Sequence, residues 1–298
     1  MNKKMKILLV GGLGYIGRRF IEKFQNEYEL IVFSKNQLIQ FSPLKKNKVF
    51  FGLVSSNDVI ESIIKTKPDV VIHLASLTGL KKCEDNPDEA FNVNVNGTAN
   101  VIKGCVKVGS KLIFLSSREV YGITKNFESH EDDKLEPINI YGQTKVKAEE
   151  LIIDVSTKNH LDYTILRLTN VYGPSTTSGV NKIIFDAVKG KIVQIFGGER
   201  IFNLIYIDDV VQAIKLVLEN NQSTGKIYNV GSQVEITLNQ LVKQLEIILK
   251  KDIIIEKFSQ KDFESTFFRP SLKRIENDIG FTAEMDLENG LKKTIMSF

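Results

Sequence analysis

The sequence predicts an α/β protein built on a doubly wound parallel sheet, with a smaller C-terminal substrate-binding lobe. Three observations support this fold class. Short apolar runs alternate with amphipathic segments of helical length through the first 174 residues, which is typical of right-handed βαβ units. The first apolar run ends in a glycine-rich turn. After Pro174 the alternation stops, which indicates that a second unit begins there.

The expected strands are short apolar runs that read as buried parallel strands. They cover residues 6–10, 30–33, 49–51, 70–74, 112–115 and 163–168. The expected helices between them cover about 14–26, 57–65, 88–108 and 141–157.

Beyond Pro174 we expect helices at 183–188, 210–218 and 238–249, with strand-like runs at 193–196, 202–207 and 227–230. We therefore predict a dinucleotide-binding domain over 1–174, to which 201–234 returns. The substrate lobe would comprise 175–200 and 235–298.

Composition excludes several classes of protein. The chain has 298 residues, of which 42% are hydrophobic, enough for a full core. Its net charge of +4 comes from scattered charges of both signs, so we expect no nucleic-acid partner. No apolar run reaches the ~18 residues of a membrane span, and the start does not resemble a signal peptide, so we expect a cytoplasmic protein. Cys83 and Cys105 are interpreted as ordinary thiols, and no Cys/His cluster indicates a metal.

The glycine-rich turn predicts a dinucleotide cofactor. It reads Gly11-Gly-Leu-Gly-Tyr-Ile-Gly17 and lies between an expected strand and an expected helix. Glycines allow a tight turn and close backbone approach, and the helix N-terminus can receive a pyrophosphate. The expected cofactor-side residues are Gly11, Gly14, Tyr15, Ile16 and Gly17.

The end of the second expected strand indicates which dinucleotide is bound. NAD sites usually carry an acidic residue there for the ribose hydroxyls. This chain reads Phe33-Ser34-Lys35-Asn36, so Ser34 and Lys35 could hold a 2′-phosphate instead. We therefore expect NADP, with NAD as the alternative. Lys35 could also be a solvated loop residue.

The chemistry is expected at Tyr141-Gly-Gln-Thr-Lys145. Residues four apart on a helix share a face, so Lys145 would lie beside the Tyr141 phenol and lower its pKa. A tyrosine tuned in this way can exchange a proton with a sugar hydroxyl. A serine from the preceding strand, Ser117 or alternatively Ser116, could hold the same oxygen.

Taken in order, these and further motifs resemble the extended short-chain dehydrogenase/reductases that act on nucleotide sugars. The resemblance covers nearly the whole chain. Besides the glycine turn it rests on His73-Leu-Ala75, Asn94-Val-Asn-Gly-Thr98, Ser116-Ser-Arg-Glu-Val-Tyr-Gly122, Tyr141-Gly-Gln-Thr-Lys145, Leu166-Arg-Leu-Thr-Asn-Val-Tyr-Gly-Pro174 and Tyr206-Ile-Asp-Asp-Val210. It implies a Rossmann fold and an NAD(P) cofactor.

The resemblance also implies roles for individual residues. Tyr141 matches the family's acid/base, Lys145 the residue that holds the nicotinamide ribose, and Ser117 the catalytic Ser/Thr. The residues that match cofactor-side positions are Leu74, Ala75 and Asn94, although Asn94 could simply be a helix-surface or capping residue. Asn170 matches an asparagine that contacts the substrate phosphates. His73 is expected only to pack or hydrogen-bond at the end of its strand.

Departures from the family pattern reduce the number of family reactions that this chain could catalyse. Dehydratases carry Asp-Glu where this chain has Arg118-Glu119, which argues against expulsion of a C6 hydroxyl. Glu119 could be a second acid/base or a structural acceptor paired with Arg118. Leu53 stands where the family usually has an adenine-contacting Asp. Arg200 and the late Arg269 are the candidates for the substrate diphosphate, and Arg200 could instead be solvated.

The favoured function is reduction of a nucleotide-linked 4-keto-hexose, in particular a 4-keto-6-deoxy sugar. The alternative is an NAD-dependent 4-epimerase, and a non-catalytic NADP-binding sensor is less favoured because the Tyr-Lys pair is present. We also expect a homodimer through the helices at 88–108 and 141–157. The candidate contacts are Ala90, Val101, Val108, Val146 and Ile153.

Overall fold

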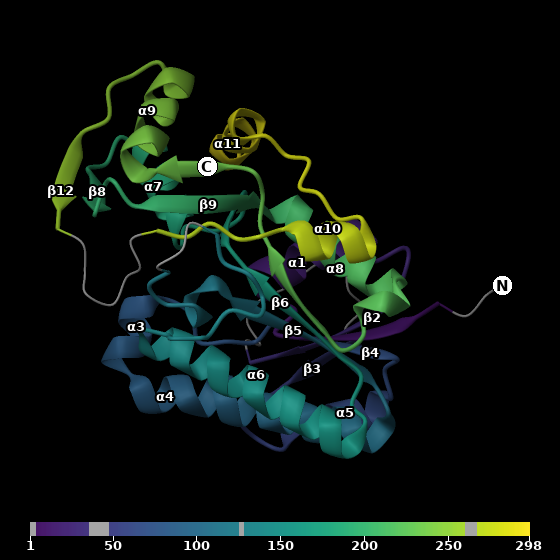
Figure 1. Ribbon diagram of the computed structural model, residues 1–298. Coiled ribbons are helices and arrows are strands. Elements are labelled where there is room, and N and C mark those ends of the chain that lie inside the picture. The colour runs from purple at the N-terminus through teal and green to yellow at the C-terminus, as the bar shows by residue number, and fades with distance from the viewer. Residues whose placement is uncertain (1–3, 36–47, 125–127, 260–266) are drawn as a thin grey trace.

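The central feature of the structure is a seven-stranded parallel sheet (Figure 1). The computed structural model describes residues 4–35, 48–124, 128–259 and 267–298. The strand order is β10-β6-β5-β4-β1-β2-β3. The strands are β1 (Lys6–Val10), β2 (Glu29–Ser34), β3 (Val49–Phe51), β4 (Val70–His73), β5 (Lys111–Ser117), β6 (Tyr163–Leu168) and β10 (Lys226–Val230). The order changes direction between β1 and β4, which opens a crevice for ligands at their carboxyl ends.

Helices cover both faces of this sheet, as the doubly wound class requires. Apolar side chains of α1 (Tyr15–Phe24), α8 (Ile207–Glu219) and α10 (Lys273–Ile279) pack on one face. Those of α2 (Asp58–Thr66), α5 (Gly97–Val108) and α6 (Ile140–Asn159) pack on the other. Figure 1 shows α5 and α6 side by side on their face. Helix α1 follows β1, and helix α6 precedes β6. Both helices begin at the same edge of the sheet, where the parallel strands have their carboxyl ends.

The helix expected over 88–108 is divided into three parts. A short α4 (Pro87–Phe91) leads through a π-helical turn at Asn92–Asn96 into α5. Within the turn, the buried Asn94 side chain accepts hydrogen bonds from Leu77 N (2.7 Å) and the Ser76 hydroxyl (3.0 Å), and donates to the Thr144 hydroxyl (2.9 Å). π-type turns inside helices are frequent near functional sites. Here the turn braces the loop after β4 against α6.

A smaller lobe is formed by two short sheets and three helices around a separate apolar core. Its strands are β7 (Asn170–Tyr172), β9 (Ile201–Tyr206) and β11 (Glu235–Thr237) in one sheet, and β8 (Val193–Phe196) and β12 (Ile255–Phe258) in the other. Its helices are α7 (Val180–Val188), α9 (Leu238–Leu249) and α11 (Leu287–Ile295). In Figure 1 this lobe lies above the carboxyl ends of the large sheet, so the two units share a boundary there.

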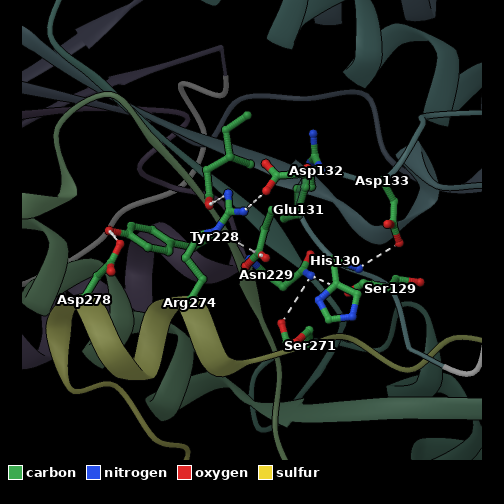
Figure 2. Close-up of polar contacts among 12 residues, drawn as sticks. Ser129, His130, Glu131, Asp132, Asp133, Tyr228, Asn229, Ser271, Arg274 and Asp278 are labelled. Atoms are coloured by element: carbon green, nitrogen blue, oxygen red, sulfur yellow. Dashed lines mark hydrogen bonds and ion pairs between the residues drawn. The ribbon is translucent and has the colours of Figure 1, made fainter.

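Buried polar contacts fasten the last strand of the large sheet to the chain around it (Figure 2). Glu131 accepts a hydrogen bond from Asn229 N (2.9 Å) on β10 and lies 3.6 Å from Arg274 Nε on α10. The Asn229 amide donates to the carbonyls of Ser129 (2.9 Å) and Ser271 (3.3 Å). The segment around residues 129–131 is therefore held between β10 and the chain that enters α10.

The predicted fold class is confirmed, and the six strands expected in the large sheet are all present. The run expected at 227–230 is β10 and lies at the edge of that sheet, whereas the run at 202–207 is β9 and pairs with β7 and β11 instead. The division into two domains remains a proposal. Elements that the sequence did not indicate are α3 (Leu80–Asp85), β7, β11, β12, α10 and α11. No helix in the described ranges has the length and apolarity that crossing a bilayer demands.

Candidate active site

The glycine turn between β1 and α1 is shaped for close backbone approach. Gly11 has φ of +85°, and a Cβ there would lie 2.6 Å from Ala75 N. A Cβ at Gly17 would lie 2.4 Å from the Gly12 carbonyl oxygen, so α1 could not pack where it does with a larger residue. No side chain caps the N-terminus of α1 at Gly14. The free N–H groups of this helix fit a diphosphate.

Two cavities meet at this turn. One, of about 540 Å³, is lined by Gly11, Gly14, Tyr15, Ile16 and Gly17 and extends to Asn170. The other, of about 400 Å³, lies at the end of β2 and is lined by residues that include Ser34, Lys35, Leu53, Leu74 and Ala75. The turn and both cavities fit a dinucleotide, with the diphosphate on α1 and the adenosine end at β2.

At the adenosine end, Ser34 is buried and Lys35 is exposed. Asn36 lies outside the described residues. Among the described residues that line this cavity, Glu89 carries a carboxylate. It lies on α4 and not at the end of β2. Glu89 and its neighbours Asn92 and Val93 are cavity residues that the sequence did not indicate, because only the packing of α4 brings them to β2.

Three expected catalytic residues meet beyond β5. Ser117, the last residue of β5, and Tyr141, at the start of α6, line a cavity of about 620 Å³. The Tyr141 hydroxyl has hydrogen bonds with the hydroxyls of Ser117 and Ser76. Lys145 Nζ lies 5.7 Å from the centre of the Tyr141 ring and donates to the Leu115 carbonyl (2.8 Å).

The structure also separates the two serines. Ser116 is buried and its hydroxyl donates to Glu149, behind the site. Ser117 Oγ faces the cavity and accepts a hydrogen bond from Glu119 N (3.3 Å). Of the two alternatives, Ser117 is therefore the one beside Tyr141.

The pKa of Tyr141 differs from our expectation. Burial raises it well above its usual range, and the negative charge of Glu119 acts in the same direction. Hydrogen bonds from Ser76 and Ser117 only partly oppose this rise. Burial also lowers the pKa of Lys145 to about 8. The expected lowering of the Tyr141 pKa was wrong for this state, because the desolvation of the phenol outweighs nearby stabilising contacts.

From residue 7 to residue 231, the chain matches the model of a family described as the NAD dependent epimerase/dehydratase family. The chain belongs to this family. The names of its relatives cover different sugar substrates and different reactions.

Two relatives and one solved structure illustrate how similar this chain is to known proteins. UDP-glucuronic acid decarboxylase 6 of Arabidopsis thaliana is 27% identical over 307 residues, which cover 97% of this chain and 88% of that protein. The N-acetyl-alpha-D-glucosaminyl-diphospho-ditrans,octacis-undecaprenol 4-epimerase of Escherichia coli O157:H7 is 28% identical over 253 residues, covering 83% and 73%. The UDP-glucose 4-epimerase of Thermotoga maritima, solved with UDP-glucose, is 28% identical with a TM-score of 0.91 and covers 98% of each chain.

In this member of the epimerase/dehydratase family, Glu119 is held by two neighbours. One carboxylate oxygen lies 2.8 Å from Arg118 Nη2, and the other accepts a hydrogen bond from Asn139 Nδ2 (2.8 Å). Asn139 in turn caps α6, because its side-chain oxygen accepts from Gly142 N (2.7 Å). Glu119 thus supports the start of the helix that carries Tyr141.

The cofactor-side residues of this family member fall into two groups. Leu74 and Ala75 donate their backbone N–H groups to Val10 O (2.8 Å each) and line the cavity at β2. The Asn94 side chain forms hydrogen bonds with Leu77 and Thr144, and it is absent from the described linings of the three large cavities. We therefore interpret Asn94 as support for the loop after β4. His73 contacts the Thr98 hydroxyl (3.0 Å), and burial lowers its pKa to about 3.

The expected substrate residues are not all brought together. Asn170 lines both the 540 Å³ and the 620 Å³ cavities, and its amide donates to Asn203 O (3.3 Å). Arg200 is buried, lines the larger cavity and lies over the Phe202 ring at 4.8 Å. Arg269 lies outside that lining and forms a two-pronged ion pair with Glu235 (2.5 and 2.6 Å).

The larger cavity also contains residues that the sequence did not indicate. Lys81 and Lys82 reach it from α3 and Lys182 from α7, so basic side chains outnumber the acidic Glu119 and Asp186 in its described lining, although Asp186 is paired with Lys182 (2.6 Å). Phe196 adds an aromatic surface. Such a lining can hold an anionic diphosphate next to a flat ring. Sequence reasoning missed these residues because they lie on elements outside the recognised motifs.

The helix residues expected in a dimer contact are differently placed. Ala90 and Val101 are fully buried within their own chain, so they were wrong candidates for an exposed face. Val108 and Val146 are partly buried, and Ile153 is 39% exposed. The packing of α4 and α5 against their own sheet and α6 accounts for this difference.

Proposed function

We propose that the protein reduces a nucleotide-linked 4-keto-hexose at C4, with NADPH as the reductant and a 4-keto-6-deoxy sugar as the favoured substrate. The observation that carries this proposal is the pair of hydroxyls of Ser117 and Tyr141 in a cationic cavity that adjoins the glycine turn. A bound nicotinamide would supply hydride to the sugar carbon.

The protein's own residues would handle the oxygen and its proton. The raised pKa of Tyr141 keeps the phenol protonated at neutral pH, which is the form that can donate to an alkoxide. Ser117, hydrogen-bonded to the same phenol, would steady the substrate oxygen. Lys145 is buried beside the Tyr141 ring and is absent from the described linings of the three large cavities; its role of holding the cofactor ribose rests on the family resemblance.

The end of β2 supports NADP over NAD. Ser34 and the exposed Lys35 line the adenosine-end cavity. They stand at the end of β2, where NAD-specific proteins carry an acidic residue that would repel a 2′-phosphate. A lysine ammonium and a serine hydroxyl are suitable partners for a phosphate group. Lys35 would then select NADPH.

The surroundings of Glu119 argue against dehydration. Both of its oxygens already accept from Arg118 and Asn139, and the residue is buried. Glu119 does line the 620 Å³ cavity, but these two contacts hold its carboxylate toward Arg118 and the start of α6. We therefore assign Glu119 to holding the catalytic helix, and propose a reaction confined to C4.

A 4-epimerase is the second candidate, because the full-length similarity to a UDP-glucose 4-epimerase favours it. It would use the same Ser117, Tyr141 and Lys145 with a retained NAD. A non-catalytic sensor is less favoured, because the tyrosine and lysine of the reaction are both present and adjacent.

The two reactions can be separated with purified protein and a nucleotide 4-keto sugar. A reductase consumes one NADPH for each product formed, and NADH supports it poorly. An epimerase instead interconverts C4-epimeric nucleotide sugars with no added cofactor. Interconversion without added cofactor, together with no NADPH oxidation on any keto sugar, would replace the reductase proposal.

The proposed assembly is a homodimer through α5 and α6. Ile153 on α6 and Val106 on α5 are exposed at 39% and 36% and could contribute to such a contact. Light scattering at micromolar concentration tests it. A mass of 33.7 kDa with full activity would show that the monomer is sufficient.

A further inference from the structure

The inner face of α6 continues past the two catalytic residues. Tyr141, Lys145 and Glu149 are spaced four apart, so they lie on one face of the helix. Lys145 is 3% exposed and Glu149 is 1% exposed. A buried carboxylate therefore lies one turn beyond the buried ammonium group.

Glu149 is bound to both strands that lie under α6. Arg167 on β6 donates through Nε to both carboxylate oxygens (3.1 and 3.2 Å) and through Nη2 to one of them (2.6 Å). Ser116 on β5 donates its hydroxyl to the same carboxylate. Ser116 and Arg167 are paired in the sheet, and Ser116 directly precedes Ser117. One carboxylate thus connects α6 to the strand end that carries the serine of the active site.

The other side of Arg167 is also fixed. Its Nη1 donates to the Tyr121 hydroxyl (2.9 Å) and to the Glu131 carbonyl (2.9 Å). Tyr121 then donates to Asn229 on β10 (2.7 Å). Glu131 and Asn229 belong to the contacts drawn in Figure 2, so the arginine is tied to the neighbouring edge strand β10 and to the segment around residue 131. Arg167 is therefore held on both sides, by Glu149 of α6 and by Tyr121 with the Glu131 carbonyl.

We propose that Glu149, clamped by Arg167, is a positioning residue of the active site: it fixes the Tyr141–Lys145 face of α6 against the end of β5 and supplies the buried negative charge that balances the Lys145 ammonium. The inference rests on the proposed roles of Tyr141 and Lys145. It concerns the geometry and charge of the chain itself, so it can be tested without turnover.

The groups that face Lys145 leave Glu149 as the main source of negative charge. His73 on β4 is neutral at physiological pH, because burial lowers its pKa to about 3. The pKa values of Tyr141 and Cys83 are both raised by burial, so the phenol and the thiol keep their protons. Burial lowers the pKa of Lys145, and the charge of Glu149 is the largest effect that opposes this lowering.

The groups that face Glu149 leave Arg167 as its main positive partner. Tyr121 and Tyr163 both feel the Glu149 charge, and burial is the first cause that raises the pKa of each, so both stay neutral. Glu149 therefore faces two cations: it is ion-paired with Arg167 (2.6 Å), and its charge also raises the pKa of Lys145 against the lowering by burial.

The test is an NMR titration of Lys145 in the cofactor-free protein, using ¹³Cε-labelled lysine. The signal is assigned from its absence in Lys145→Arg. We expect the Lys145 pKa in Glu149→Gln to fall by roughly one unit below the wild type, as expected for loss of a nearby opposite charge. The matched control is Glu150→Gln, which removes the neighbouring glutamate of an exposed pair with Lys147 and should leave the titration unchanged.

Kinetics provide a second readout. In Glu149→Gln the alkaline limb of kcat should move to lower pH by the same amount as the Lys145 titration, while the KM for the nucleotide sugar stays close to that of the wild type. A folded Glu149→Gln protein with an unchanged Lys145 titration would overturn the proposal. If the Lys145 signal moves but no nucleotide sugar is turned over, the proposed function fails and the positioning role stands.

Glu149→Gln leaves the buried Arg167 without its partner and could fail to fold. In that case Glu149→Gln combined with Arg167→Met removes both charges, a replacement that buried ion pairs often tolerate. The Lys145 pKa should again lie below the wild-type value in this double variant. A value at or above the wild type would contradict the proposal.

Discussion

Replacing Tyr141 by phenylalanine removes one hydroxyl from the centre of the site and leaves the ring in place. In the structure this hydroxyl contacts the hydroxyls of Ser76 and Ser117. Both serines keep other partners when it is gone. Ser76 still contacts Asn94 Oδ1 (3.0 Å), and Ser117 still accepts from Glu119 N (3.3 Å).

The structure therefore separates the effect on folding from the effect on rate. Two neutral hydrogen bonds contribute about 1 kcal/mol each, and the serines retain part of this, so we expect a loss of about 1–2 kcal/mol of unfolding free energy. Loss of a positioned proton donor lowers the rate by about 10²–10⁴-fold. That corresponds to about 3–5 kcal/mol of transition-state stabilisation.

The assay is single-turnover and steady-state oxidation of NADPH with a nucleotide 4-keto sugar, combined with urea unfolding of both proteins. Tyr141→Phe should show a midpoint close to the wild type and a much lower kcat. Tyr163→Phe, a tyrosine on β6 away from the cavity, provides the control. A Tyr141→Phe protein that keeps more than half of the wild-type kcat would refute the assignment of the proton donor.

Three further expectations follow from the same geometry. Lys35→Ala should weaken NADPH binding roughly tenfold and leave NADH binding unchanged in a fluorescence titration, since only NADPH carries the 2′-phosphate; equal affinity of the wild type for both would contradict the NADP assignment. Gly17→Ala should lower both the melting temperature and cofactor affinity, because its Cβ would lie 2.4 Å from Gly12 O, whereas Gly14→Ala, at 3.1 Å from Gly11 O, should be milder; the reverse order would show that the turn adapts. The folded pKa of Lys145, about 8, lies below its ordinary value of 10.5, so the unfolded chain binds more protons between these values and the unfolding free energy should rise with pH across that window; the rise should be smaller in Lys145→Met, and identical pH slopes would contradict a buried titrating lysine.

The sequence located the parts of the site that depend on local motifs. Gly11 and Gly17 could be placed because a tight turn and close helix packing permit few other residues. Tyr141 and Lys145 could be placed because their spacing defines a helical face. The roles assigned to all these residues remain predictions.

The parts that depend on tertiary contacts were beyond the sequence. The motif could not show that Glu235 engages Arg269 or that Asn139 binds Glu119, whereas the pairing of Glu119 with Arg118 was one of the two alternatives that the sequence offered. The sign of the Tyr141 pKa shift was also missed, because it follows from burial that only the packed structure defines.

Short elements were missed for a related reason. Strands β7 and β11 have three residues each and form by pairing with β9, so the tertiary structure defines them. Ala90 and Val101 have apolar side chains that fit either a dimer contact or the chain's own core. Their complete burial became visible only once α4 and α5 were packed.

The proposed C4 reduction can be tested directly with NADPH that carries deuterium on the transferred position of nicotinamide C4. With a nucleotide 4-keto sugar as substrate, we expect one deuterium at sugar C4 of each product molecule, measured by mass spectrometry and NMR, and one NADPH oxidised per product. Formation of C4-epimeric products without added cofactor, and without deuterium, would contradict reduction and identify the protein as an epimerase.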